Sequence, residues 1–309
     1  MKIYNNIKEV PFIQFPVATI GMFDGVHLGH QQILAHLVTK AQENNGESIV
    51  ITFDTHPRIV LHHESYKLKF INSYQEKIQL IEKAGVDHLI FLPFTKEFSQ
   101  QSTAEFVKDF LVNSLHIKAL ILGYDNRFGN KENNNFSQLS VISNEYKFDI
   151  EQVEVKEMDG YAVSSSKIRE ALDKGEIQIA NELLGYPYEL SGKVVYGNQI
   201  GKKIGFPTAN IDLENDFKLI PSMGVYAIRV EWNNHIYNAM LNIGIRPTLN
   251  INKLSIEAHL FDFDTNIYGQ YIKVYFVDKI REEQRFDNLN ELIVQLHKDK
   301  ITATTLLKQ

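Results

Sequence analysis

The strongest constraint on the fold is a change of pattern near residue 188 of this 309-residue chain. Before that point, short apolar runs alternate with amphipathic stretches. After it, strand-like segments follow one another with only turn residues between them. A domain usually has about 100–200 residues, so a chain of this length favours two domains. We therefore expect one domain over residues 1–186 and another over residues 187–309.

The first half predicts a doubly wound parallel sheet. Its apolar runs are bounded by Gly, Pro, Asp or Asn, which is typical of buried parallel strands. The expected strands are residues 17–20, 48–53, 88–93, 119–123 and 148–155. The expected helices are residues 29–43, 73–84, 103–115, 164–173 and 176–184. Strand–helix alternation favours parallel pairing, and such sheets bind ligands at the carboxyl ends of their strands.

The second half predicts a small antiparallel β-barrel or sandwich. Five segments show partial alternation of apolar and polar residues with no helix between them. They are residues 188–196, 224–232, 235–243, 255–263 and 271–279. Residues 288–297 have helical spacing, and we expect this helix to close the domain.

Composition excludes several classes of function. The net charge of −6 provides no general attraction for nucleic acid or for an anionic membrane. No apolar stretch approaches the roughly 20 residues that span a bilayer. The absence of cysteine excludes disulfides and thiolate chemistry. We expect a cytoplasmic protein without nucleic-acid or membrane partners, whose oligomeric state the sequence does not give.

The most distinctive segment of the first half is residues 21–30, which read Gly-Met-Phe-Asp-Gly-Val-His-Leu-Gly-His. It follows an apolar run directly and opens the expected helix 29–43. His27 and His30 are three residues apart, so they face the same way on a helical turn. A helix N-terminus favours anions, and two imidazoles there can donate hydrogen bonds to phosphate oxygens. The alternatives are two surface or capping histidines, or two metal ligands, although no third ligand is evident nearby.

Residues 197–210 form the corresponding segment of the second half. They read Gly-Asn-Gln-Ile-Gly-Lys-Lys-Ile-Gly-Phe-Pro-Thr-Ala-Asn. Gly201 and Gly205 predict a flexible loop whose backbone N–H groups can surround phosphates, and Lys202 adds positive charge. The Gly-Lys-Ser/Thr ending of a Walker A loop is missing. Taken alone, such a loop is also typical of a solvated hairpin turn.

The first of these segments resembles the signature of the nucleotidylyltransferases, Gly-x-Phe-Asp-Gly-x-His-x-Gly-His. Residues 163–169 resemble the Ser-Ser-x-x-Ile-Arg motif of the same enzymes. The resemblance implies a Rossmann-like domain in which His27 and His30 are catalytic and bind the phosphates of ATP. The other implied ATP- or phosphate-binding residues are Gly21, Phe23, Asp24, Ser164, Ser165 and Arg169.

Two further segments are similar to those of the FAD synthetases. Residues 52–57 read Thr-Phe-Asp-Thr-His-Pro, and residues 123–129 read Gly-Tyr-Asp-Asn-Arg-Phe-Gly. The resemblance implies a flavin site that contains Asp54, Pro57, Asp125 and Phe128. Asn126 stands where the family usually has an aromatic residue.

The loop of the second half ends in a segment that closely resembles the Gly-x-Pro-Thr-Ala-Asn motif of riboflavin kinases. The resemblance implies that Thr208 and Asn210 bind the Mg²⁺ carried by ATP, near Gly201, Lys202 and Gly205. Lys202 stands where the family more often has arginine. Residues 256–263 match another family segment, which implies that Glu257 is the general base.

In order and in extent, these segments resemble the bacterial bifunctional riboflavin kinase/FAD synthetases. The resemblance implies phosphorylation of riboflavin to FMN in the second half and adenylylation of FMN to FAD in the first. ATP is the implied co-substrate of both reactions, and riboflavin, FMN and FAD are substrates or products. One alternative is a riboflavin kinase with weak or lost adenylyltransferase activity. The other is a flavin-binding regulator without catalytic activity.

Overall fold

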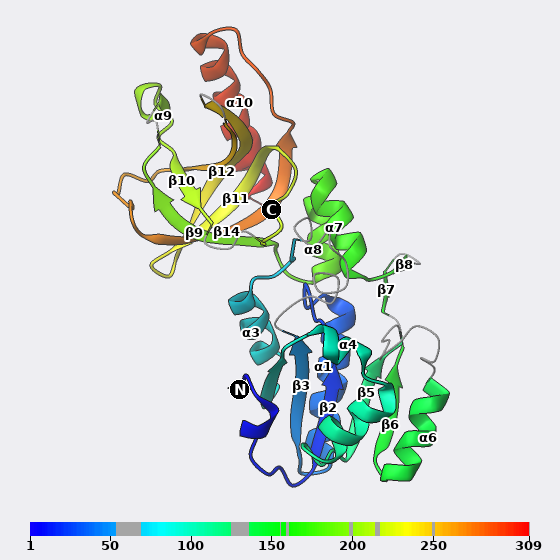
Figure 1. The fold of residues 1–309 in the computed structure, drawn as a ribbon. Coiled ribbons are helices and arrows are strands. Elements are labelled where there is room, and N and C mark those ends of the chain that lie inside the picture. Colours follow the sequence, from blue (N-terminus) through cyan, green and yellow to red (C-terminus); the bar gives the residue numbers. More distant parts are fainter. Residues whose placement is uncertain are drawn as a thin grey trace. The chain divides into compact units, whose positions relative to one another are not determined.

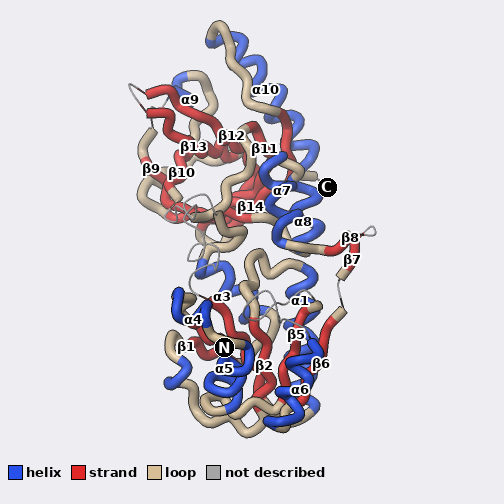
Figure 2. The backbone as a smooth tube through the Cα atoms, turned by 45° about the vertical axis from the view of Figure 1, so that its right-hand side comes forward, coloured by secondary structure: helices blue, strands red, loops and turns tan. Residues whose placement is uncertain are grey.

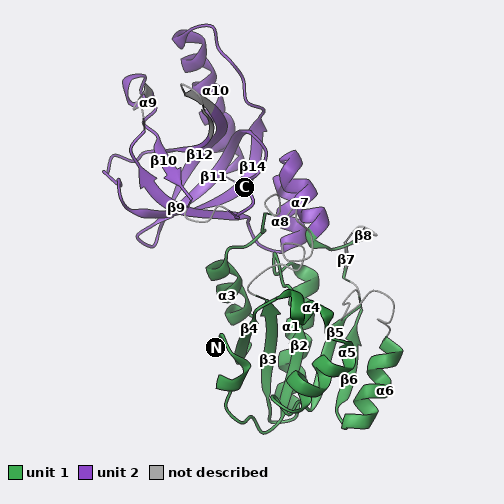
Figure 3. Ribbon diagram, in the orientation of Figure 1, with its two compact units in different colours: residues 1–165 green, residues 166–309 purple. Residues whose placement is uncertain are grey.

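The structure is a computed structural model that describes residues 1–53, 69–124, 136–154, 156–158, 161–197, 200–213, 217–248 and 251–308. The chain divides into two compact units, residues 1–165 and residues 166–309 (Figure 3). Each unit has its own main sheet.

A six-stranded sheet forms the centre of the first unit (Figure 1). Its strands pair in the order β1-β4-β3-β2-β5-β6, and every pair is parallel. They are β1 (Lys2–Tyr4), β2 (Pro16–Ile20), β3 (Glu47–Phe53), β4 (His88–Leu92), β5 (Ala119–Gly123) and β6 (Asp149–Val153). A small hairpin, β7 (Glu157–Met158) with β8 (Tyr161–Ala162), follows. The predicted doubly wound sheet is confirmed.

Helices cover both faces of this sheet. They are η1 (Ile7–Glu9), α1 (Leu28–Glu43), α3 (Tyr74–Lys83), α4 (Lys96–Gln100), α5 (Thr103–Phe106), the π-helical turn η3 (Val107–Val112) and α6 (Phe136–Tyr146). One buried cluster joins α1 and α3 to Val17 and Val50. A second cluster joins η3 and α6 to Ala18 and Ile51. Successive residues of a strand point to opposite faces, so the two clusters fill the two sides of the sheet.

A closed barrel forms the centre of the second unit, with the strand order β10-β13-β12-β11-β14-β9. All of its pairs are antiparallel. The strands are β9 (Glu189–Val195), β10 (Ala209–Asp212), β11 (Gly224–Trp232), β12 (His235–Thr248), β13 (Ile251–Leu260) and β14 (Tyr271–Arg281). The short helix α9 (Ile200–Lys203) lies between β9 and β10. The predicted barrel is confirmed, with β10 as a strand that the sequence did not predict.

Two helices precede the barrel, α7 (Ser165–Lys174) and α8 (Ile177–Leu184). Asn181 of α8 donates from its side-chain amide to the carbonyl of Phe276 in β14, at 3.0 Å. Its amide oxygen accepts from the backbone N–H of Tyr188 at 2.7 Å. These bonds explain why α8 belongs to the same compact unit as the barrel. The structure divides the chain after residue 165, whereas the sequence predicted a domain boundary after residue 186. The two helices occupy the segment between the two boundaries.

The C-terminal helix α10 (Leu289–Leu306) packs along β11, β12 and β14 of the barrel (Figure 2). Ala303 is completely buried in a cluster with Ala227 and Met240. A double hydrogen bond also ties this helix to β14, because the guanidinium of Arg281 donates to both carboxylate oxygens of Asp299 at 2.8–3.1 Å. The expected closing helix is therefore present and is longer than predicted.

None of the helices formed by the described residues combines the length and the apolar composition of a bilayer span.

Candidate active sites

The Gly21–His30 segment lies at the carboxyl end of β2, in the middle of the first unit's sheet. β2 pairs with β3 on one side and with β5 on the other, so the chain changes direction across the sheet at this strand. Ligands of open α/β sheets bind at such a switch point. The loop that follows β2 has left-handed backbone angles, with φ of 47° at Phe23 and 33° at Val26. A non-glycine residue in this region is strained, and strained residues are common in functional sites.

Several side chains hold this strained loop in place. The ammonium of Lys77 donates to the carbonyl of Met22 at 2.9 Å, and the hydroxyl of Thr52 donates to the same oxygen at 3.2 Å. The carboxylate of Asp24 is 2% exposed and accepts from the backbone N–H of Ile71 at 3.0 Å. The hydroxyl of Ser165 donates to the carbonyl of Asp24 at 2.8 Å. The loop is therefore fixed from both sides before any ligand binds.

The imidazoles of His27 and His30 are stacked, with 3.7 Å between ring centroids and 18° between ring planes. His27 is also the N-cap of α1, because its Nδ1 accepts from the backbone N–H of His30 at 3.4 Å. An accepting Nδ1 carries no proton, so the proton of His27 lies on Nε2. His27 can therefore cap the helix through Nδ1 and at the same time donate to a ligand through Nε2.

His30 is a neutral side chain at physiological pH. Burial holds the pKa of its imidazole well below the usual value, and electrostatic interaction with His27 and Lys77 lowers this pKa further. Burial likewise lowers the pKa of the Lys77 ammonium, while Asp24 raises it. The Nδ1 atom of His30 is buried without a hydrogen-bond partner among the described residues. The pair can therefore offer N–H donors to an anion without itself carrying two adjacent charges.

Several residues predicted for this site lie together in the first unit, around the loop after β2. Phe23 is 1% exposed, and its ring lies 5.1 Å from that of His30, beneath Gly21. Ser164 and Ser165 stand at the start of α7. Arg169 lies one turn further along α7, in the second unit. The predicted flavin residues Asp54, Pro57, Asp125 and Phe128 lie outside the described residues, as does Asn126.

Described residues of the second unit line two cavities. The first, here called the apolar cavity, has a volume of about 300 Å³. The second, here called the loop cavity, has about 290 Å³. The apolar cavity is lined by Gly201, Ile204, Phe206, Thr208, Val225, Met240, Leu241, Asn242, Glu257, His259, Arg281, Glu283, Gln284, Phe286, Leu292 and Leu296. The loop cavity is lined by Val194, Lys202, Pro207, Thr208, Ala209, Ala258, Leu260, Phe263, Asp264, Thr265, Asn266, Ile267 and Tyr268.

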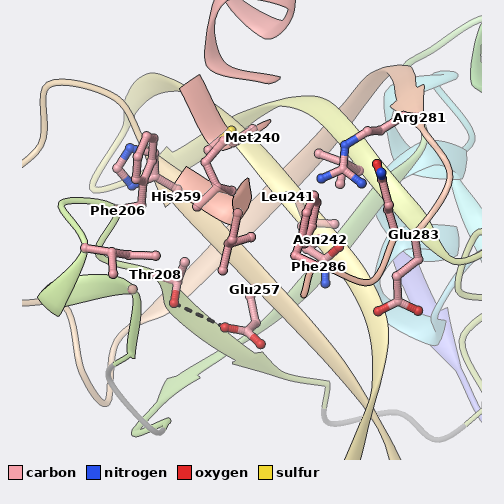
Figure 4. Close-up of a pocket in the computed structure, with 16 residues that line it drawn as sticks. Phe206, Thr208, Met240, Leu241, Asn242, Glu257, His259, Arg281, Glu283 and Phe286 are labelled. Carbon is pink, nitrogen blue, oxygen red and sulfur yellow. Dashed lines mark hydrogen bonds between the residues drawn. The ribbon is translucent and has the colours of Figure 1, made fainter. Parts of the chain in front are cut away.

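Thr208 belongs to the walls of both cavities. Its hydroxyl donates to the carboxylate of Glu257 at 3.2 Å (Figure 4). Glu257 lies on β13 opposite Asn210 of β10, since these two residues are paired across the strands. The barrel thus brings Thr208, Asn210 and Glu257 together, although 47 residues or more separate the first two from the third in the chain.

Within the glycine-rich segment, residues 200–203 form the helical turn α9 in place of the predicted flexible loop. A Cβ atom on Gly201 would lie 2.2 Å from the carbonyl oxygen of Phe206, so only glycine fits there. A Cβ atom on Gly197 would lie 2.2 Å from the side-chain nitrogen of Asn210. The missing side chain of Gly197 therefore provides the space in which the Asn210 amide sits. Gly205 has a φ of 84°, and Lys202 lies in α9 and lines the loop cavity.

Lys77 and His259 are among the residues of these sites that were not predicted. Lys77 is 6% exposed although it is a lysine, and it shares the buried side of α3 with Ile81. A charged residue on the apolar face of a predicted helix is the sequence feature that could have identified it. His259 lies two residues after Glu257 on β13 and lines the apolar cavity.

Comparison with known proteins separates the same two parts of the chain. Residues 13–167 match the family model of FAD synthetase, and residues 184–307 match that of riboflavin kinase. A bifunctional riboflavin kinase/FMN adenylyltransferase from Haemophilus influenzae is 42% identical over 286 residues, which cover 92% of both chains. A protein of the same name from Listeria monocytogenes is 36% identical over 285 residues, which cover 92% of this chain and 90% of the relative.

A solved structure from Streptococcus pneumoniae, described as a macrolide-efflux protein, shares the fold of the whole chain. It superposes with a TM-score of 0.89 at 30% identity, over 98% of both chains.

Proposed function

This chain belongs to the bifunctional riboflavin kinase/FMN adenylyltransferase family, and we propose how its two sites carry out the two reactions. The riboflavin kinase part transfers a phosphoryl group from ATP to riboflavin and forms FMN. The FMN adenylyltransferase part then transfers the adenylyl group of a second ATP to FMN and forms FAD. We propose functional domains over residues 1–186 and 187–309, because Ser164, Ser165 and Arg169 complete the adenylyltransferase motif. Consumption of ATP in both steps supports a cytoplasmic location.

The position of Thr208 in the walls of both cavities carries the proposal for the kinase. The apolar cavity, with Phe206 and Phe286 among its lining residues, suits the flat isoalloxazine ring of riboflavin. The loop cavity contains Lys202, whose charge suits the phosphates of ATP. A phosphoryl group that passes from ATP in the loop cavity to riboflavin in the apolar cavity would cross at Thr208, next to Glu257.

Glu257 would act as the general base of this transfer. Its carboxylate would take the proton of the ribityl hydroxyl as the hydroxyl oxygen bonds to the γ-phosphorus of ATP. The bond between that phosphorus and the oxygen bridging to the β-phosphate breaks, and ADP leaves with the electron pair. The hydrogen bond from Thr208 orients the carboxylate before the substrates bind.

Thr208 and Asn210 also fit the Mg²⁺ that accompanies ATP. A hydroxyl and an amide oxygen are neutral hard ligands, which suits an ion that brings phosphate oxygens and water as its other ligands. Asn210 is 9% exposed and occupies the space left by Gly197, so its amide has a fixed position. Among the residues that the structure describes, no group of three or more His, Asp and Glu side chains could hold an ion. Bound there, Mg²⁺ would neutralise charge on the phosphate oxygens.

The adenylyltransferase step would use hydrogen-bond donors instead of a base. An oxygen of the FMN phosphate bonds to the α-phosphorus of ATP, and pyrophosphate leaves with the electrons of the broken bond. Negative charge grows on the phosphate oxygens during this exchange, and the N–H groups of His27 and His30 would stabilise it. Gly21, Phe23 and Asp24 shape the loop that carries them, and Asp54, Pro57, Asp125 and Phe128 are the proposed flavin residues.

Incubating the purified protein with riboflavin, ATP and Mg²⁺ tests this function. We expect FMN to appear first and FAD to follow, and we expect FAD directly when FMN is supplied. Chelation of the metal should stop FMN formation. Formation of FMN without FAD would support the alternative of a kinase that has lost adenylyltransferase activity. Flavin binding without any product would support the alternative of a regulator.

Lys77 supplies a second test of the adenylyltransferase site. Its ammonium holds the carbonyl of Met22 in a nearly buried position, and a hydrogen bond with a charged donor contributes about 1.5–3 kcal/mol. We therefore expect Lys77→Gln to lower the kcat/KM of FAD formation by about tenfold to a hundredfold.

Lys83→Gln is the matched control, because Lys83 ends the same helix and is exposed. FMN formation in the same sample is the internal control, because it depends on the second unit. An unchanged rate of FAD formation in Lys77→Gln would show that the loop does not depend on this lysine.

A further inference from the structure

His259 lies in the second unit, where the kinase motif meets the barrel. Its side chain projects from β13, is 7% exposed and lines the apolar cavity (Figure 4). The Nδ1 atom lies 2.8 Å from the carbonyl oxygen of Pro207. A carbonyl can only accept, so Nδ1 carries a proton and donates.

The surroundings of the ring keep it in this orientation and in this state. The ring of Phe206 packs edge-on against it at 5.2 Å between centroids, and the ring of Phe261 lies at 5.8 Å. Burial lowers the pKa of the His259 imidazole; the Pro207 carbonyl raises it, and the charge of Lys300 lowers it again. The hydrogen bond requires a proton on Nδ1, and the lowered pKa favours the neutral imidazole, whose single proton then lies on that atom.

The hydrogen bond from His259 has a counterpart two residues earlier on the same strand. Residues two apart in a strand point to the same face, so Glu257 and His259 point to one side of β13. Glu257 accepts from the hydroxyl of Thr208, and His259 donates to the carbonyl of Pro207. Two consecutive residues of the kinase motif are therefore held by two side chains of β13. Glu257 binds Thr208, and His259 binds Pro207.

We propose that His259 is a positioning residue of the kinase. By holding the Pro207 carbonyl, it fixes the peptide that leads into Thr208 and keeps the Thr208 hydroxyl and the Glu257 carboxylate in register where the two cavities meet. The role rests on the kinase assignment given above. His259 need not touch either substrate, because it acts on the reaction through Thr208.

Three substitutions of His259 separate this role from simple packing. In His259→Asn, the amide nitrogen takes the place of Nδ1 and can still donate to Pro207. In His259→Gln, the longer side chain puts its amide near the place of Nε2, and His259→Leu has no donor at all. In His259→Gln and His259→Leu the buried carbonyl of Pro207 has lost the donor that His259 provides. We expect this loss to lower the kcat of FMN formation by about tenfold to a hundredfold.

The expected pattern is a split between kinetic parameters. In the Leu and Gln variants kcat falls and the concentration of Mg²⁺ that gives half the maximal rate rises, while the KM for riboflavin stays within about twofold. The Asn variant should regain most of the lost kcat. FAD formation from supplied FMN should be the same in all three.

His297→Leu is the matched control, because His297 packs against Phe206 at 5.0 Å and is exposed. It should keep kcat within about twofold. A Leu variant with full kcat would overturn the proposal. Equal losses in the Leu and Asn variants, together with an equal fall in melting temperature, would also overturn it and would leave His259 a packing residue. A parent protein that forms no FMN would overturn the kinase assignment and this role with it.

Discussion

FAD formation from supplied FMN is expected to fall roughly ten-thousandfold when His27→Asn and His30→Gln are combined, because one donor to a developing negative charge contributes about 10²–10³ in rate. The choice of substitutions follows from the geometry. His27 caps α1 through Nδ1, and asparagine is an effective N-cap, so His27→Asn should preserve the helix. The loss can then be assigned to the missing Nε2–H donor. The measurement is the rate of pyrophosphate release with saturating ATP and FMN.

The matched control is His36→Gln, because His36 lies on α1 and is partly exposed, bound to Glu151 at 2.6 Å. It should leave FAD formation within about twofold. FMN formation by the double variant should equal that of the parent, since the kinase site lies in the other unit. A double variant that loses less than about tenfold would mean that the histidine pair is a helix cap and a packing element only.

Glu257→Gln is expected to lower FMN formation by about 10²–10⁴-fold, which is the usual contribution of a general base. Glutamine keeps an oxygen that can accept from the Thr208 hydroxyl, so the 3.2 Å contact and the shape of the cavity should persist. The substitution keeps the shape of the side chain and removes its negative charge and its ability to take a proton. Single-turnover phosphorylation of riboflavin measures the effect directly.

Glu282→Gln provides the control, because Glu282 is an exposed carboxylate whose ion pair with Lys279 lies at 2.7 Å. An exposed pair contributes about 1 kcal/mol or less, so FMN formation should stay near the parent rate. FAD formation from FMN should persist in both variants. Retention of more than about a tenth of the FMN rate by Glu257→Gln would assign proton removal to another group or to water.

The sequence predicts the sheet and the barrel because both rest on local patterns. The fully buried runs of β2, β4 and β5 are near-continuous apolar segments, as strands covered on both faces are. β10 was missed because its first two residues, Ala209 and Asn210, end a functional motif and its four residues show no alternation of their own. It becomes a strand only through pairing with β9 and β13.

The length of α10 depends on packing that the sequence does not display. Residues 298–306 contain three threonines, which favour helices weakly. The hydroxyls of Thr302, Thr304 and Thr305 each donate to the carbonyl four residues earlier. Burial of Ala303 against the barrel extends the helix over this segment. Tertiary contacts therefore override the local preference here.

For the sites, motifs predicted the residues within each segment but not the contacts between segments. His27 and His30 were predicted from the motif that contains them, whereas Lys77 reaches Met22 across 55 positions. His259 was inside a matched segment, yet its bond to Pro207 spans 52 positions. Such partners are set by how β-strands and helices pack, so only the three-dimensional structure identifies them.

The shared wall at Thr208 has a consequence for inhibitor design. Compounds that occupy the apolar cavity and compounds that occupy the loop cavity would sit on two sides of one residue. Joining such a pair through a short linker past Thr208 would turn the second binding event into an intramolecular one. The gain would come from effective concentration and would need no new contact with the protein. The linker would occupy the place proposed for transfer of the phosphoryl group, so a single molecule is expected to block both substrates.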